Sequence, residues 1–389
     1  MPLARHIIVL LDGTNCAATR GLRKDLTNLF SIGIALNNQK ILSETGIPVG
    51  EQVIFYFPGP GARTTIAAPI ERAFGHGIES TIVEAYLAIA NNLRDPETDR
   101  VYIFGYSRGA IAAKGLATLL AKSGLIRRNY LHRLKHAWDL YKGDVSAKVH
   151  LTDDIIHRVT VPFMGLFDPV LGPPTSLVDV PYSGELEDCV EFAVEIVAYD
   201  ECRFSFGEEL WSSDEPIDQD DVFARPLRSP RANLQQIWIP GAHSDIGGHQ
   251  GDQLLGLISL LTMLERIQAR AGLSLNPAYV EKQLNKLLNY EGVIGISSPW
   301  RYTFRGIPQL VGSVRRPMKS AATYLHPVIS MLDGQTIRLG KKKRAYRFRD
   351  GDISDYNNYS FELSEVFPNR ANPGVEIGTR ILDILSQLE

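Results

Sequence analysis

The feature that most constrains this chain is a predicted strand that runs into a predicted helix through a serine flanked by glycines. Residues 101–117 read VYIFGYSRGAIAAKGLA. The apolar start is typical of a buried strand, and the alanine-rich part after Gly109 is typical of a helix. A Cβ at Gly105 or Gly109 would collide with neighbouring backbone in such a turn. The pattern G-x-S-x-G therefore predicts a nucleophile elbow that exposes the hydroxyl of Ser107. The alternative is a plain glycine-rich turn.

Apolar runs of strand length alternate with helical patterns along most of the chain. This alternation predicts an α/β protein with a mostly parallel central sheet and helices on both faces. We expect strands within residues 7–11, 53–57, 101–104, 158–167, 190–199 and 233–239, and helices within 26–36, 78–93, 110–125, 130–141, 253–271 and 279–288. Periodicity is weak over residues 292–352. We expect a catalytic domain over residues 1–275 and a C-terminal extension over 276–389 that packs on it.

Four polar residues follow predicted strands directly. They are Asp12, Ser107, Asp168 and His243. Ligand sites of parallel sheets lie beyond the carboxyl ends of the strands. The sequence therefore predicts that these four side chains share one site.

A serine nucleophile needs a base, and the base needs an acid that fixes its tautomer. His243 lies in the loop IWIPGAHSDIGGH after a predicted strand, which makes it the expected base. Asp168, in GLFDPV, is the expected acid. The chain order of Ser107, Asp168 and His243 is that of α/β-hydrolases, which is the fold class we predict.

Rivals exist for both partners of the serine. His76 and His249 lie in glycine-rich loops and are alternative bases. Asp200 follows an apolar run and is an alternative acid. Asp245 is another, but it stands only two residues from His243, so we expect it to fix the loop instead.

The oxyanion of an acyl-transfer reaction needs two hydrogen-bond donors. One is expected to be the backbone N–H of Arg108, after the nucleophile. The other is expected from Gly13 or Thr14, in a loop that Asp12 anchors. The alternative for this loop is an ordinary β-turn. The stretch LLDGTN is also similar to the D-x-D-G-T motif of haloacid-dehalogenase-type phosphatases, but Leu10 occupies the position of their nucleophilic aspartate.

Composition excludes several other classes of function. The 389 residues carry a formal net charge of −3, which does not favour nucleic acid as a partner. The three cysteines have no metal or redox spacing, and we expect neither a metal nor an organic cofactor. The longest apolar tract, residues 254–264, is far short of the roughly 20 residues that span a bilayer. No signal peptide is recognised, so we expect the protein in the cytoplasm of the producing cell.

With these motifs in order, the chain resembles the catalytic domain of type VI secretion phospholipase effectors. The resemblance rests on the blocks IVLLDGTN, TNLF, YFPGPG, FGHGIESTIVEAY, VYIFGYSRGAIAAKGLATLLAKSGLI, GLFDPV, AYDECRF and WIPGAHSDIGG. It implies an α/β-hydrolase-like fold and serine esterase chemistry on glycerophospholipids, with Ser107, Asp168 and His243 as the triad. It also implies delivery to a target cell by type VI secretion, with a secretion-apparatus or immunity protein as partner.

The chain departs from the family pattern at three positions. Pro169 replaces a threonine, His249 replaces a glycine, and Glu195 replaces a histidine. A basic run, RLGKKKRAYRFR over residues 338–349, has seven basic residues. Beside an anionic lipid headgroup each could contribute about 1 kcal/mol, which would support peripheral membrane contact. The alternative is a solvated surface run or a partner site.

The motifs predict a serine esterase or lipase that works through an acyl-enzyme, and the family resemblance implies glycerophospholipids as its substrates. Two alternatives stay open at this point. One is an intracellular hydrolase of non-lipid esters, and the other is a non-catalytic binding protein with the same sheet.

Overall fold

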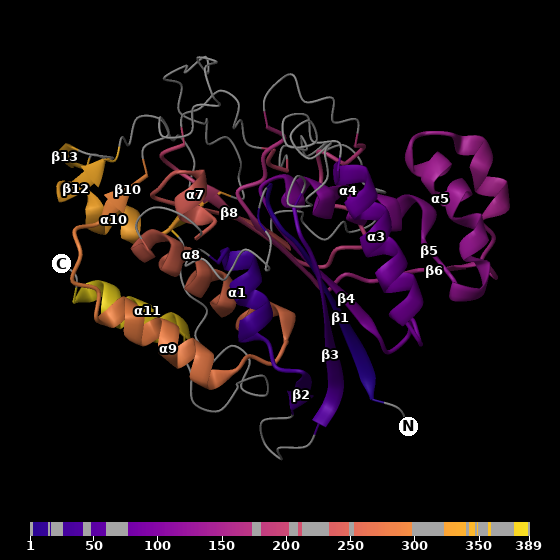
Figure 1. The fold of residues 1–389 in the computed structure, drawn as a ribbon, viewed down its shortest axis with the longest axis horizontal. Helices are drawn as coiled ribbons and strands as arrows, with labels where there is room; N and C mark the ends of the chain where they lie inside the picture. Colours follow the sequence, from indigo (N-terminus) through magenta and orange to yellow (C-terminus); the bar gives the residue numbers. More distant parts are fainter. Residues whose placement is uncertain are drawn as a thin grey trace, which may run out of the picture.

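The computed structural model describes residues 3–14, 16, 26–41, 48–59, 77–172, 180–201, 209–211, 233–248, 253–297, 323–339, 342–346, 348, 357–358 and 377–387. A nine-stranded sheet crosses the molecule, with helices on both of its faces (Figure 1). All pairings within this sheet are parallel except that between β2 and β3. The α/β-hydrolase-like fold with a mostly parallel sheet is thereby confirmed.

The strands lie in the order β14–β11–β9–β8–β7–β4–β1–β3–β2. Their bounds are β1 Ala4–Leu11, β2 Gln39–Ile41, β3 Pro48–Phe57, β4 Arg100–Tyr106, β7 Phe163–Phe167, β8 Ala193–Ala198, β9 Leu234–Ile239, β11 Thr323–Leu325 and β14 Asn357–Asn358. β11 pairs with β9, so the C-terminal part of the chain extends the sheet. The division at residue 275 stays a prediction.

The register of the central strands brings their carboxyl ends to one level. Leu11 of β1 pairs with Gly105 of β4, and Tyr106 of β4 pairs with Phe167 of β7. Because these strands are parallel, the residue that follows each of them emerges at the same edge of the sheet. This edge is where the predicted site must form.

Each face of the sheet has its own hydrophobic core. On one face lie α1 Asn28–Ala35 and α8 Gln253–Arg266, with α9 Pro277–Leu288 and α11 Ile377–Ser386 packed against these helices (Figure 1). On the other face lie α3 Gly77–Asn92 and α4 Arg108–Ser123, with α5 Leu134–Tyr141 packed against α4 (Figure 1). Ile8 and Leu10 of β1 point into the first core, and Ile7, Val9 and Leu11 point into the second. Burial on both faces explains why this strand reads as a continuous apolar run.

The connection between α4 and β7 differs from the single helix predicted for residues 130–141. It contains β5 Leu125–Ile126, the 3₁₀-helix η2 Arg128–Arg133, α5, the 3₁₀-helix η3 Val145–His150, and β6 Ile156–His157. Tyr130 has non-helical dihedral angles inside η2. The N–H of Arg127 donates to the carbonyl of Ile155, so the β5–β6 pairing fixes how the chain enters this segment.

The C-terminal part also forms a second, three-stranded sheet. Its strands are β10 Gly295–Ile296, β12 Thr336–Leu339 and β13 Lys342–Ala345, and α10 Val328–Leu332 precedes β12. The exposed side chains of Arg338, Lys343 and Arg344 belong to the predicted basic run. Residues 340, 341, 347 and 349 of that run lie outside the described residues.

No helix in the described parts of the chain combines the length and the apolar character needed to cross a membrane.

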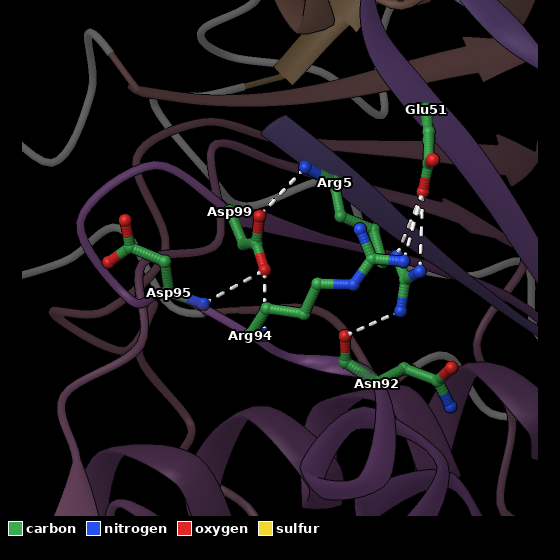
Figure 2. Close-up of polar contacts among 6 residues, drawn as sticks. All are labelled: Arg5, Glu51, Asn92, Arg94, Asp95 and Asp99. Atoms are coloured by element: carbon green, nitrogen blue, oxygen red, sulfur yellow. Dashed lines mark hydrogen bonds and ion pairs between the residues drawn. The ribbon is translucent and has the colours of Figure 1, made fainter. Parts of the chain in front are cut away.

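Polar contacts join the amino-terminal parts of β1 and β3, at the end of the sheet opposite the predicted site, to the loop after α3 (Figure 2). One oxygen of Asp99 accepts from the backbone N–H of Arg5 at 2.7 Å. The other accepts from the N–H groups of Arg94 at 2.8 Å and Asp95 at 3.2 Å. The guanidinium of Arg5 also lies 3.2 Å from Glu51 of β3. Since Asp99 is only 5% exposed, its loss would leave three backbone donors without this acceptor.

We expect Asp99→Ala to lower the free energy of unfolding by about 1–3 kcal/mol, because three partly buried backbone donors lose their acceptor. Urea denaturation followed by circular dichroism measures this. Glu97→Ala, at an exposed position of the same loop, is the control and should change stability little. Equal stability of the two variants would show that Asp99 does not hold this edge.

Candidate active site

Ser107 stands in a strained turn between β4 and α4. Its φ is 58° and its ψ is −126°, a conformation that side-chain-bearing residues rarely adopt. A Cβ added at Gly105 would lie 2.5 Å from the Cα of Ala110, and one added at Gly109 would lie 2.1 Å from the carbonyl oxygen of Leu11. Both flanking residues must therefore be glycine for the turn to form beside β1.

A series of hydrogen bonds joins the three residues predicted as a triad. Nε2 of His243 lies 2.9 Å from Oγ of Ser107, and Nδ1 lies 2.6 Å from Oδ2 of Asp168. The second oxygen of Asp168 accepts from the N–H of Ala198 at 2.8 Å. Asp168 is fully buried, whereas Ser107 and His243 each keep 6% exposure. In the described residues only Ser107 and Asp168 combine a side chain with a positive φ.

Tyr106 is a site residue that the sequence analysis missed. Its ring stacks on that of His243 with centroids 5.0 Å apart and planes at 24°. Its hydroxyl donates to the carbonyl oxygen of His243 at 3.3 Å. A Cβ at Gly247 would lie 2.2 Å from this ring, so the histidine loop wraps closely around Tyr106. The position before the serine is variable in G-x-S-x-G, so the motif carried no signal for this role.

The rival residues lie elsewhere or outside the described part of the chain. His76 and His249 are not among the described residues. Asp200 accepts from the N–H of Gly241 at 2.9 Å. Asp245 accepts from the N–H of Ala242 at 2.9 Å, which is a loop contact and not a contact with the imidazole of the base.

Asp12 anchors the loop after β1 through three hydrogen bonds. Its carboxylate accepts from the N–H of Gly13 at 2.7 Å, from the hydroxyl of Thr27 at 2.8 Å and from the hydroxyl of Tyr56 at 2.6 Å. Thr27 belongs to the TNLF block, but neither it nor Tyr56 was expected to bind Asp12. The sequence places them 15 and 44 residues away, so only the fold reveals the contact.

The same loop lies against Tyr106 and Ser107. A Cβ added at Gly13 would lie 2.7 Å from Tyr106 and 3.2 Å from the Cβ of Ser107. The N–H of Gly13 already donates to Asp12, which favours Thr14 as the loop's oxyanion donor. The guanidinium of Arg108 donates to the hydroxyl of Thr14. Burial lowers the pKa of Arg108 to about 10, so it stays protonated at neutral pH.

The electrostatics of this edge favour negative charge on a reacting oxygen. The 16-residue helix α4 begins at Arg108, so its N-terminal dipole points at Ser107. The N–H of Arg108 belongs to the first turn, whose donors have no acceptor within the helix. A backbone donor next to Ser107 is what a candidate oxyanion hole needs.

Glu195, one of the departures from the family pattern, is fully buried on β8 and pairs with a lysine. Its carboxylate lies 2.8 Å from Nζ of Lys114 on α4 and accepts from the amide of Gln236 at 2.9 Å. Burial lowers the pKa of Lys114, and the charge of Glu195 opposes that change. The pair links α4 to β8 of the sheet.

The described residues contain no group of three or more His, Cys, Asp or Glu arranged to hold a metal ion. The fold and the hydrogen-bonded Ser–His–Asp series are those of the α/β-hydrolase-like class. Residues 5–266 match the family model for the catalytic domain of the Tle1-like phospholipase effectors of type VI secretion. The chain therefore belongs to this family of phospholipase catalytic domains, which are hydrolases.

Three further similarities were found. An uncharacterized protein of Saccharomyces cerevisiae is 27% identical over 194 residues, which cover 43% of this chain and 26% of that protein. The Tle1 effector, in a structure bound to the VgrG spike of the type 6 secretion system, is 19% identical with a TM-score of 0.36, covering 64% of this chain and 52% of that one. An uncharacterized protein from Pseudomonas aeruginosa is 19% identical with a TM-score of 0.41, covering 71% and 47%. The match thus spans about half of each solved chain.

The titration of Asp12 gives a test of its anchoring role. Burial raises the pKa of Asp12 to about 6 from 3.8, against the hydrogen bonds that lower it. The folded protein therefore holds this proton more tightly than the unfolded chain. The contribution of Asp12 to stability is largest below about pH 4 and declines by up to about 3 kcal/mol as the pH rises through 6.

We expect the stability of the wild type relative to Asp12→Asn to fall as the pH rises from about 4 to about 7, because asparagine does not titrate. Urea titrations across this range measure the difference. Asp153→Asn, at an exposed position, is the control. A difference that does not vary with pH would contradict the burial of an ionisable Asp12.

Proposed function

We propose that the protein is a serine esterase that hydrolyses the acyl ester bonds of glycerophospholipids. The observation that carries this proposal is the hydrogen-bonded series from Oγ of Ser107 through His243 to Asp168, at 2.9 Å and 2.6 Å. A serine hydroxyl with a base and a carboxylate in this order is the arrangement of acyl transfer. Membership of the phospholipase family supports the class of substrate.

The mechanism follows from the atoms at the edge of the sheet. His243 accepts the proton of Ser107 through Nε2 while Oγ attacks the ester carbonyl carbon. The N–H groups of Arg108 and Thr14 donate to the oxyanion of the tetrahedral intermediate. His243 then gives the proton to the departing alcohol, and the acyl group stays on Ser107. Water repeats the cycle, is deprotonated by His243 and releases the carboxylic acid.

The acyl ester is favoured over the phosphodiester bonds of the same lipids. A family of phospholipases is defined by the lipid and not by the bond that is cleaved. The backbone donors beside Ser107 fit a single oxyanion next to an attacked carbonyl carbon. The hydrogen bond between Asp168 and Nδ1 of His243 supports a role for Asp168 in stabilising the imidazolium that forms during this step.

Delivery and partners form a further part of the proposal. Family membership supports delivery of the protein to a target cell by type VI secretion. The Tle1 effector, to which the chain is similar, has been seen bound to a VgrG spike. We propose a component of the secretion apparatus as one partner, an immunity protein as another, and contact with a phospholipid surface during catalysis.

We expect Ser107→Ala to lower ester hydrolysis by more than about 10⁴-fold, because the attacking oxygen is lost. Hydrolysis of phospholipid liposomes and of short-chain soluble esters is measured side by side, with lipid profiling of the products. A fluorophosphonate should label the wild type and not Ser107→Ala. Ser80→Ala, at an exposed position on α3, is the matched control and should keep both activity and labelling.

The outcomes separate the alternatives. Turnover retained by Ser107→Ala would overturn the serine mechanism. Hydrolysis of soluble esters without liposome hydrolysis would favour a non-lipid substrate. A wild type that neither turns over esters nor reacts with the fluorophosphonate would favour a binding protein.

We expect Gly13→Ala to lower kcat by about 100-fold, because the new Cβ would collide with Tyr106 and displace the oxyanion loop. Steady-state kinetics on a soluble ester measure this. Gly184→Ala is the matched control, since its Cβ would meet nothing within 4 Å. If both variants keep wild-type kcat, the loop after β1 is not part of the oxyanion site.

A further inference from the structure

The loop that carries His243 is held by three carboxylates. The backbone N–H groups of residues 241–243 each donate to a different one. In chain order the acceptors are Asp200 at 2.9 Å, Asp245 at 2.9 Å and Glu201 at 3.2 Å. Three consecutive donors bound to three separate acidic side chains fix both the position and the direction of this backbone.

Gathering three carboxylates beside one loop, two of them buried, costs free energy of folding, so their presence points to a role for this arrangement. Glu201 and Asp245 are fully buried. Burial raises the pKa of Asp245 to about 6, and the charge of Asp200 adds to this effect. Burying like charges close together is unfavourable, and consecutive backbone N–H groups offset part of this cost. Neutral residues would hold an ordinary surface loop at lower cost.

The C-terminal part of the chain completes these contacts. Ser297, directly after β10, donates its hydroxyl to Oδ1 of Asp245 at 2.5 Å and its N–H to Oδ2 at 2.9 Å. Tyr346, directly after β13, donates its hydroxyl to Asp200 at 3.2 Å. Both residues lie beyond residues 5–266, the part that matches the family model. The segment outside the family domain thus reaches the loop of the candidate base.

We propose that Asp200, Glu201 and Asp245 form a carboxylate brace that holds His243 in line with Ser107. The C-terminal segment completes the brace through the two donors described above. This inference rests on the proposed function, since it assigns roles at the same site. The members of the brace are positioning residues, because the contacts described for them are with the loop backbone and with Ser297 and Tyr346, and not with Ser107.

The brace matters because His243 must meet two partners at once. Its ring has to reach Oγ of Ser107 with one nitrogen and Asp168 with the other. Gly241, with a φ of 131°, leaves the preceding backbone free to adopt other conformations. A displacement of about 1 Å can cost about 100-fold in rate. Hydrogen bonds to three consecutive N–H groups restrict that freedom.

We expect Ser297→Ala and Tyr346→Phe each to lower kcat for p-nitrophenyl butyrate by about 10-fold, and the double variant by up to about 100-fold, with KM little changed. Ser330→Ala on α10 and Tyr324→Phe on β11 make the same atomic changes in the same segment. These two controls should keep wild-type kcat. Urea denaturation of all variants verifies that each is folded.

A second pair of variants tests whether the hydrogen-bond acceptor at position 245 is what positions the loop. Asp245→Asn keeps an oxygen that can accept from residues 242 and 297, so we expect it to retain most of the activity. Asp245→Ala removes the acceptor and should lose about 10-fold or more in kcat. Equal kcat for the two variants would overturn the positioning role of Asp245.

A spectroscopic measurement makes the test independent of turnover. The proton between Nδ1 of His243 and Asp168 is observed by NMR and assigned by its loss in His243→Ala. It should shift or broaden in Ser297→Ala and Tyr346→Phe and stay unchanged in the two controls. An unchanged signal in both brace variants overturns the inference, whatever their rates. A shifted signal in a protein that hydrolyses no ester would support the brace and overturn the proposed function.

Discussion

The parallel register of β1, β4 and β7 is the constraint on which the candidate site depends. It pairs Tyr106 with Phe167, so that Ser107 and Asp168 leave neighbouring strands at the same level. Glycine at position 109 lets α4 start against the carbonyl group of Leu11. Two members of the site are thus set by strand pairing alone. Their positive φ values store strain that a sheet buried on both faces can support.

The histidine is placed by a different physical means. β9 lies two strands away from β7, so the loop after it must cross the edge of the sheet to reach the serine. Stacking on Tyr106 sets the plane of the ring, and the brace sets the backbone. The stacking acts on the imidazole ring of His243 and the brace acts on its backbone. Together they fix the position of the ring relative to Ser107 and Asp168. Strand pairing positions Ser107 and Asp168, whereas we propose that the carboxylate brace positions His243.

Much of this arrangement was predictable from local patterns. The glycine-flanked serine and the polar residues after apolar runs were visible because each signal lies within a few positions of the chain. The contacts of Tyr56 with Asp12 and of Ser297 with Asp245 were not, because no local pattern reports which distant residues meet. β11, with three residues, was also hidden, since so short a strand carries no periodicity. The features that the sequence did not reveal all depend on contacts between residues far apart in the chain, and not on local secondary-structure propensity.

One consequence concerns where the folded unit can be cut. The family match ends at residue 266, but β9 continues the sheet through β11, which lies well beyond that point. A polypeptide shortened to the matched region would expose the backbone donors and acceptors of β9 as an open edge. Open edges recruit strands from other molecules and lead to aggregation. The boundary of evolutionary similarity is therefore not a boundary of physical stability.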